Sequence, residues 1–188
     1  MLSTIDINYA KYSLMSDSFK DEYQFTLDYM KNAPEVKDYF SEKDISDLEF
    51  IQVKMMQECI INNNMEGLYE QITSLPQYSQ EKLMKSMAYE VILTFKYIVD
   101  RVNQITELEN EMLKSCAPGD DYTNIVEQVD FRVFPAYYTQ MRELADGDIT
   151  KFEQIKNMKY SDCFVELIYR QKQADFEKLV MRAQMKKP

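Results

Sequence analysis

A heptad pattern of apolar residues runs through the middle of the chain, between Ser79 and Cys116. Apolar side chains recur there at alternating steps of four and three residues: Met84, Ala88, Val91, Phe95, Ile98, Val102 and Ile105. This spacing places them on one side of an α-helix. The segment also lacks Gly and Pro. It therefore predicts one continuous helix, about 54 Å long at about 1.5 Å per residue, against which the other helices pack.

Shorter amphipathic segments precede this long helix. Residues 17–30 carry apolar side chains at helical spacing, and Asp17 is a candidate N-cap. Ser41 or Asp44 begins a second predicted helix that extends to Ile61, and a third covers residues 65–75. In the second helix we expect one inward face, formed by Ile45, Leu48, Ile51, Met55, Cys59 and Ile60.

Two further helices and a turn are predicted near the C-terminus. Pro135 begins a helix that extends to about Ala145, and residues 146–148 (Asp-Gly-Asp) form a turn. Thr150 and Glu153 then have the spacing of a capping box for a short helix. Ser161 caps the last long helix, in which Glu166 and Arg170 form a pair. Its apolar face consists of Val165, Tyr169, Phe176, Val180 and Ala183.

The strongest break in the pattern is at residues 117–121, Ala-Pro-Gly-Asp-Asp. We place a domain boundary here, which gives a helical body over residues 1–117 and a C-terminal helical appendage over 118–188. Shortly after the break, Val129, Phe131 and Val133 alternate with polar residues, as in a β-strand. Residues 124–134 also fit a helix. A strand would need a partner from the N-terminal residues or from another copy of the chain.

Glycine and proline are rare, with three and five residues respectively in 188. An all-β domain needs many more turn residues. The predicted fold class is therefore all-α: a helical bundle around one long central helix, with a C-terminal helical appendage and one short strand if residues 129–133 are extended.

Charge is distributed unevenly along the chain. The net charge is −10, but residues 1–150 contain 13 basic and 27 acidic residues, whereas residues 151–188 contain 9 basic and 5 acidic ones. An acidic body disfavours direct binding to nucleic acid. The basic end, which includes Arg182, Lys186 and Lys187, suits a head-to-tail contact between copies. Folding back onto its own body is an equally good reading of the same charges.

No window approaches the roughly 20 apolar residues of a membrane span, and the N-terminus lacks a basic segment followed by an apolar run. We expect neither a membrane protein nor classical secretion. Cys59, Cys116 and Cys163 are widely spaced, which is typical of reduced thiols in a cytosolic compartment.

The chain contains no histidine, which removes the usual catalytic triads and zinc sites. Three scattered glycines cannot form a phosphate-binding loop. The remaining candidates for metal ligands are carboxylate pairs, such as Asp120 with Asp121 or Asp146 with Asp148, and acidic residues beside glycine are usually turn formers. We therefore expect no enzyme activity, no cofactor and no metal ion.

Aromatic residues cluster around Pro135 and give the best binding candidate: Phe131, Phe134, Tyr137 and Tyr138. Aromatic side chains are enriched at protein interfaces because they bury a large area at low entropic cost. The alternative is that these rings form the junction between the last helices and the long helix.

The stretch from Gly147 to Arg182 combines a Gly-Asp turn, a short helix with Ile155 and Met158, a Ser-Asp cap and a final amphipathic helix. In this pattern it resembles C-terminal segments of tail-assembly and neck proteins of tailed bacteriophages. The resemblance covers about a fifth of the chain and transfers no functional residue.

The resemblance implies a non-enzymatic structural or assembly protein of a phage particle, in the neck, connector or tail region. Such a protein would form homo-oligomers or a ring, contact other virion proteins, and be found in the virion or in the host cytoplasm during assembly. The alternative is a monomeric cytosolic adaptor or regulator that binds a single protein partner through the aromatic cluster at 131–138.

Overall fold

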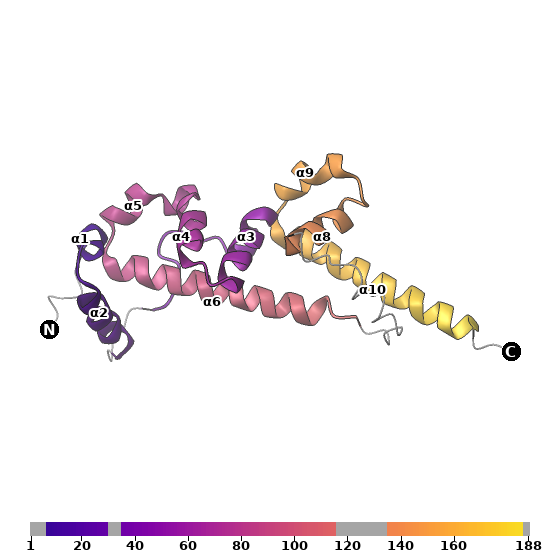
Figure 1. The fold of residues 1–188 in the computed structure, drawn as a ribbon, viewed down its shortest axis with the longest axis horizontal. Coiled ribbons are helices and arrows are strands. Elements are labelled where there is room, and N and C mark those ends of the chain that lie inside the picture. Colours follow the sequence, from indigo (N-terminus) through magenta and orange to yellow (C-terminus); the bar gives the residue numbers. More distant parts are fainter. Residues whose placement is uncertain (1–6, 30–34, 116–134, 186–188) are drawn as a thin grey trace. The chain divides into compact units, whose positions relative to one another are not determined.

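The computed structural model describes residues 7–29, 35–115 and 135–185, and the regular structure in these ranges is helical (Figure 1). This confirms the all-α prediction; the segment that could be a strand, 129–133, lies outside the described residues. Short 3-10 turns occur at Ile45–Asp47, Pro76–Tyr78 and Ile149–Lys151. The α-helices are α1 (Tyr9–Ser13), α2 (Asp17–Tyr29), α3 (Phe50–Ile61), α4 (Met65–Thr73), α5 (Gln80–Lys85), α6 (Ala88–Met112), α8 (Ala136–Leu144), α9 (Phe152–Lys156) and α10 (Tyr160–Met185).

The long helix predicted from Ser79 to Cys116 is broken after α5, so that prediction is wrong in its continuity. Ser86 is extended, with φ −87° and ψ 168°, and Met87 forms an antiparallel bridge with Asn8. Backbone hydrogen bonds hold the bridge on both sides, from Tyr9 to Ser86 at 2.8 Å and from Ala88 to Ile7 at 2.6 Å. The break satisfies backbone groups through a segment about 80 residues earlier in the chain, a pairing that local periodicity cannot show.

The heptad pattern itself is confirmed within α6. Five of its apolar positions are buried: Ala88, Val91, Ile98, Val102 and Ile105. Burial of these side chains on one face of the helix is what stabilises α6 in its surroundings, since helix propensity alone contributes little.

The described chain forms two compact units, and the division falls inside α3 and α6. One unit comprises residues 1–45 and 59–103. Its N-terminal part has a small core in which Tyr23 and Ala88 are buried. Partly buried apolar side chains surround them: Ile7, Tyr9, Tyr12, Phe19, Tyr89 and Ile92.

Polar contacts in the same unit hold the segment before α3 against α6. The backbone N–H of Tyr39 donates to the hydroxyl of Thr94 at 3.0 Å, and Arg101 Nε lies 2.8 Å from Asp44 Oδ2. The Tyr78 hydroxyl donates to Asp38, and burial together with this hydrogen bond raises the pKa of Tyr78. These contacts add to the ring contacts of Tyr39 with Tyr89 and of Phe40 with Tyr78 in fixing this irregular segment.

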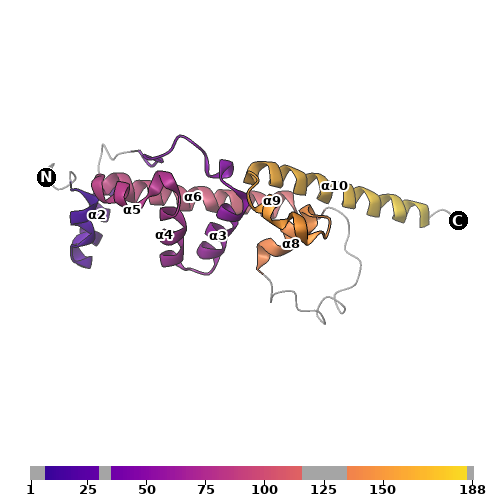
Figure 2. The same ribbon diagram turned by 90° about the horizontal axis from the view of Figure 1, so that it is seen from above.

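The other unit comprises residues 46–58 and 104–188. An antiparallel bridge between Glu49 and Lys159 joins the start of α3 to the start of α10. On either side, the Phe50 N–H donates to the Met158 carbonyl at 2.7 Å and the Tyr160 N–H donates to the Leu48 carbonyl at 2.9 Å. Two helices that are far apart in sequence therefore begin side by side. Figure 2 shows α8 against the N-terminal half of α10 in this unit.

The inward face predicted for the helix that ends at Ile61 is confirmed at Ile45, which is fully buried, and is wrong at Met55; Leu48, Ile51 and Ile60 are half-buried. Met55 is exposed and Cys59 only half-buried. The buried side chains of α3 are Phe50, Val53, Lys54, Met56 and Gln57. Lys54 and Gln57 belong to the buried face because a carboxylate of α6 satisfies them, so apolar spacing alone selected the wrong side of the helix.

The predicted domain boundary at 117/118 lies outside the described residues and stays a prediction. Within the ranges that the structure describes, no helix combines the length and the apolar character that crossing a bilayer requires.

Candidate functional site

One side of the first turns of helix α10 packs against the rest of its unit. Tyr160, Cys163 and Leu167 are all buried there, at helical spacings of three and four residues. The ring of Tyr160 stacks on Phe50 with a centroid distance of 6.3 Å and on Phe164 at 5.8 Å. This part of α10 is therefore a core helix.

A buried ion pair lies next to this packed side. Lys54 Nζ donates to Glu109 Oε1, and both side chains are about nine-tenths buried or more. Gln57 Nε2 donates to the second carboxylate oxygen at 2.9 Å and to the Thr106 hydroxyl at 3.1 Å. The Lys54 ammonium also lies 5.5 Å from the centroid of the Tyr160 ring. The carboxylate thus has a donor on each oxygen, as buried charges require.

Burial shifts the pKa of three groups in or beside this ion pair: Lys54, Tyr160 and Cys163. Removal from water lowers the pKa of Lys54, although Glu109 opposes the shift. Burial, and then the nearby Glu109 carboxylate, raises the pKa of Tyr160. Burial also raises the pKa of the Cys163 thiol to about 11, with a smaller contribution from Asp162. At neutral pH the thiol is protonated and a poor nucleophile, so the cluster has the character of a polar core.

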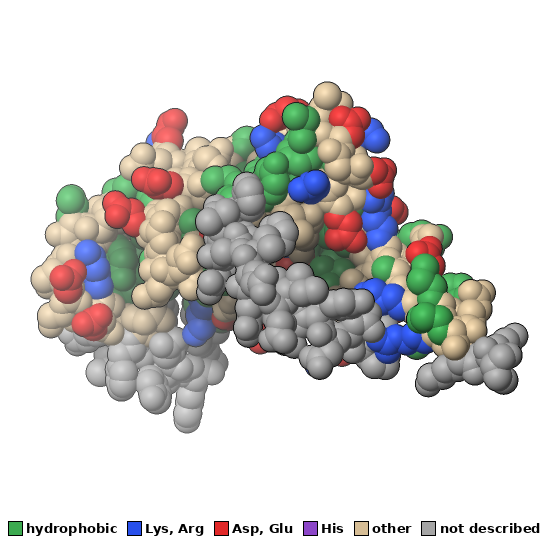
Figure 3. Space-filling view, turned by 45° about the vertical axis from the view of Figure 1, so that its right-hand side comes forward, with side chains coloured by type: hydrophobic (Ala, Val, Ile, Leu, Met, Phe, Trp, Pro, Cys, Tyr) green, Lys and Arg blue, Asp and Glu red, His purple; other side chains and the backbone are tan. Residues whose placement is uncertain are grey.

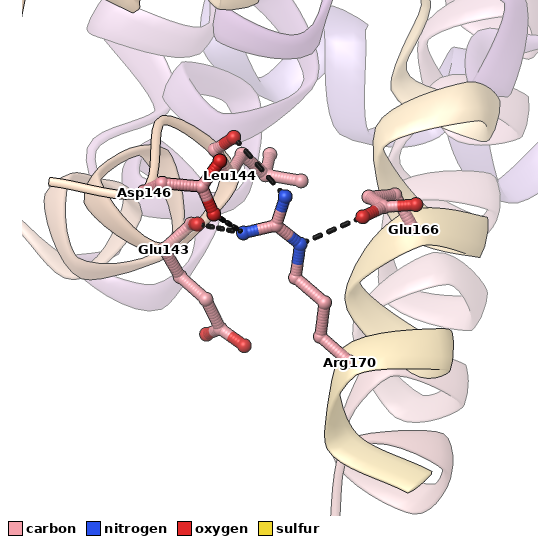
Figure 4. Close-up of polar contacts among 5 residues, drawn as sticks. All are labelled: Glu143, Leu144, Asp146, Glu166 and Arg170. Carbon is pink, nitrogen blue, oxygen red and sulfur yellow. Dashed lines mark hydrogen bonds and ion pairs between the residues drawn. The ribbon is translucent and has the colours of Figure 1, made fainter. Parts of the chain in front are cut away.

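Arg170 connects the middle of α10 to the end of α8 (Figure 4). Its Nε lies 2.7 Å from Glu166 Oε1, which confirms the predicted pair, and its Nη1 lies 2.7 Å from Asp146 Oδ1. The guanidinium also donates to the carbonyls of Glu143 and Leu144, in the last turn of α8. The Glu143 carbonyl also accepts from the Asp146 backbone N–H at 3.1 Å, and a cation at this end of α8 complements the helix dipole.

The turn that follows α8 is the predicted Asp-Gly-Asp turn. Asp146 and Gly147 both have positive φ, at 53° and 79°. The predicted capping box is wrong, however, because Asp148 and not Thr150 is the cap. Its carboxylate accepts from the Thr150 N–H at 3.0 Å and from the Thr150 hydroxyl at 2.6 Å. These hydrogen bonds lower the pKa of Asp148.

Asp175 holds α10 one turn further along. It is buried, and its Oδ1 accepts from the Ser115 hydroxyl at 2.6 Å and from Gln171 Nε2 at 3.1 Å. A carboxylate at this depth needs such donors to offset its loss of hydration. Asp175 is the last buried side chain of α10: from residue 176 to residue 185 every side chain is exposed or half-buried.

The apolar residues predicted for one face of the last helix do have helical spacing, but they are exposed to solvent and not packed inside the molecule. Tyr169 is 64% exposed and Phe176 is 67% exposed, and the other members are exposed as well. At about 100° per residue these positions lie within roughly a third of the helix circumference, away from Cys163 and Leu167. We call this surface the α10 stripe; its residues are Val165, Tyr169, Phe176, Leu179, Val180 and Ala183.

Figure 3 shows hydrophobic side chains along the C-terminal part of α10, beside Lys and Arg side chains. Met181 and Met185 are exposed too, on a different side of the helix from the α10 stripe. The helix therefore presents an anchored side and an apolar side in the same unit.

The sequence singled out other residues as the interface. Tyr137 and Tyr138 are half-buried at the start of α8, and the Tyr138 ring meets Phe152 edge-on at 5.5 Å. Arg182 is half-buried on α10. Phe131, Phe134, Lys186 and Lys187 lie outside the described residues, and their interface role stays a prediction.

Two signals in the sequence pointed to the α10 stripe. One is its apolar spacing, and the other is that the alternative faces of the helix contain Asp175, Lys178 and Arg182. The sequence could not show that Asp175 is buried and hydrogen-bonded. These hydrogen bonds allow α10 to pack through a side that contains a charged residue as well as apolar ones.

As to metal binding, the described parts of the chain hold no group of three or more Cys, Asp and Glu side chains placed to share an ion. The geometry that stands out is instead an exposed apolar helix face on a fixed support, which is suited to binding another protein. Comparison with protein-family models, with curated proteins and with solved structures found no match for the chain.

Proposed function

We propose that the chain is a non-enzymatic assembly protein and that the α10 stripe is the surface on which it binds another protein. The observation that carries this proposal is the contrast within one helix. Asp175 is buried and hydrogen-bonded, whereas Tyr169 and Phe176 on the other side are about two-thirds exposed.

Exposed apolar area is costly, at about 25 cal/mol per Å² that a partner could cover. Soluble proteins scatter single exposed apolar residues freely, but a contiguous row of them marks an interaction site. The α10 stripe is such a row, with Lys172 between Tyr169 and Phe176, and Arg170 and Asp175 fix the orientation in which it is presented.

The spacing of the α10 stripe also indicates the kind of partner. Anchors at i, i+4, i+11 and i+15, from Val165 through Tyr169 and Phe176 to Val180, follow one helix face. Such faces bind a second helix or a helix-lined groove.

The resemblance of residues 147–182 to tail-assembly and neck proteins of tailed phages includes the α10 stripe up to Val180. It supports a role as a structural or assembly protein of a phage particle, in the neck, connector or tail region. The partners would then be further copies and other virion proteins, in the virion or in the host cytoplasm during assembly.

Site-specific photo-cross-linking in the cells that naturally make the protein tests the proposal. A photoreactive residue at Phe176 should form an adduct with a protein, whereas one at Met181, on another side of the same helix, should form far less. The substitution Phe176→Asp should release the chain from its native complex, and Met181→Asp should leave the complex intact. Equal cross-linking at both positions, or a native complex that survives Phe176→Asp, would contradict the proposal.

A further inference from the structure

We infer that the partner of the α10 stripe is the same stripe of a second copy, with the two α10 helices antiparallel. This inference rests on the proposed function and names the partner for that surface. Three features carry it: the register of the apolar residues, the position of Lys172, and the area that the pair would bury.

The register of the α10 stripe is complementary to itself. Five of its six residues fit alternating a and d positions of a heptad, which Lys172 completes: Val165, Lys172 and Leu179 are at d, and Tyr169, Phe176 and Ala183 are at a. Val180 is at the flanking e position. In an antiparallel pair each a position meets a d position of the other helix. Val165 then faces Ala183 of the second copy, and Tyr169 faces Leu179. Each small side chain meets a larger one, as close packing requires.

Lys172 is the one charged residue among these heptad positions, and it selects the orientation. In the antiparallel register it faces Phe176 of the second copy, where an ammonium can lie over the aromatic ring. In a parallel pair it would face Lys172 of the second copy, and the two charges would repel inside the seam. The attraction between Lys172 and Phe176 and the avoided repulsion between two Lys172 side chains therefore both favour the antiparallel pair.

The area of the α10 stripe suits such a pair. Large aromatic side chains bury about 150–250 Å² each, so Tyr169 and Phe176, two-thirds exposed, would each contribute on the order of 130 Å². With the four aliphatic residues the stripe offers roughly 600 Å² per chain, or about 1,200 Å² for the pair, which reaches the lower end of the range for stable interfaces.

The rest of α10 leaves the α10 stripe available to a second copy. The buried side chains of α10 are Tyr160, Cys163, Leu167 and Asp175, and they lie on other sides of the helix. Pairing through the stripe would keep the Arg170 contacts to α8 in place, since those also lie off the stripe.

Sedimentation equilibrium of the purified full chain tests the inference. The wild-type protein should approach twice the chain mass of 22.4 kDa as its concentration rises. Phe176→Asp should remain at the mass of one chain, while Met181→Asp should associate like the wild type. Circular dichroism of both variants verifies that they are folded.

A charge pair then tests the orientation. Tyr169→Lys and Leu179→Glu should each abolish association alone. The double variant should associate again, because antiparallel helices place each new lysine opposite a new glutamate, and its association should weaken with salt. A double variant that stays at the mass of one chain, while the wild type dimerises, would overturn the antiparallel arrangement.

Other outcomes overturn the inference as a whole. If the wild-type chain is a monomer at all concentrations, the second copy is not the partner. If Phe176→Asp nevertheless releases the chain from its native complex, the α10 stripe binds a different protein and the proposed function stands without the dimer. A monomer that co-sediments with vesicles rich in anionic lipid would make the stripe a membrane-binding face. A monomer that Phe176→Asp destabilises in urea would place the stripe against the chain itself.

Discussion

Asp175 and Phe176 are neighbours in α10 and meet opposite environments. The carboxylate of Asp175 is 4% exposed and accepts a hydrogen bond from Ser115 at 2.6 Å, whereas the Phe176 ring is 67% exposed. Hydrogen bonds offset the burial of the carboxylate, whereas the Phe176 ring leaves apolar area in water that a partner could cover.

Arg170 should contribute measurably to the stability of its unit. Replacement by alanine removes the ion pair with Asp146 and the hydrogen bonds from the guanidinium to the carbonyls of Glu143 and Leu144. We expect a loss of about 1–2 kcal/mol in the free energy of unfolding, since the group is partly exposed to solvent. Urea unfolding followed by circular dichroism gives the value.

Arg142 is the matched control, because it is an exposed arginine on α8. Arg142→Ala should change the free energy of unfolding by less than about 0.5 kcal/mol. Arg170→Lys should restore only part of the loss, since an ammonium cannot reach all of the acceptors at once. Equal unfolding curves for Arg170→Ala and the wild type would show that the guanidinium contacts do not stabilise the unit.

The buried pair of Lys54 and Glu109 should show strong coupling. Lys54→Met leaves the Glu109 carboxylate buried without its cation, and we expect a cost of about 3–5 kcal/mol. The double variant Lys54→Met/Glu109→Met removes both charges and should return to within about 1 kcal/mol of the wild type or exceed it. Gln57 then keeps its hydrogen bond to Thr106.

A double-mutant cycle in guanidinium chloride measures this coupling directly. If the costs of Lys54→Met and Glu109→Met simply add in the double variant, the two side chains do not act as a pair.

The buried thiol of Cys163 should make stability depend on alkaline pH. Its pKa is raised from 9.0 to about 11 in the folded chain. Below about pH 9 the thiol is protonated in both states, and its contribution to stability is fully present. As the pH rises from about 9 to about 11, the unfolded chain loses the proton first, so stability falls by up to about 2 kcal/mol.

Comparison with Cys163→Ala isolates this effect from the tyrosines, whose raised pKa values act in the same direction. The variant should lose less stability than the wild type between about pH 8 and about pH 11 in urea titrations. Parallel pH profiles for the two proteins would show that the Cys163 thiol titrates normally when folded.

Apolar periodicity predicted the buried face of a helix best where apolar residues predominate on that face. In α6 the residues from Ala88 to Ile105 recur at heptad spacing, and five of them are buried. The same reasoning failed for α3, because its buried face includes Lys54 and Gln57, which depend on a carboxylate about fifty residues later. A partner that distant leaves no local signal.

The α10 stripe shows the other limit of the sequence. Its spacing was visible, but the sequence could not show whether the stripe packs inside the molecule or faces outward. Which side of α10 faces outward depends on the Ser115 and Gln171 hydrogen bonds to Asp175 and on the contacts of Arg170 with the end of α8 and the turn after it. These polar contacts orient the helix, and those of Asp175 with Ser115 and of Arg170 with Asp146 join residues far apart in sequence.

Hydroxyl-radical footprinting of Tyr169 and Phe176 tests most directly whether the α10 stripe is a binding surface. The dilute wild-type chain should be oxidised at both rings, whereas in the native complex both should be protected and Met181 should react as before. Rings that are already protected in the dilute chain, or that react equally fast in the complex, would contradict the account.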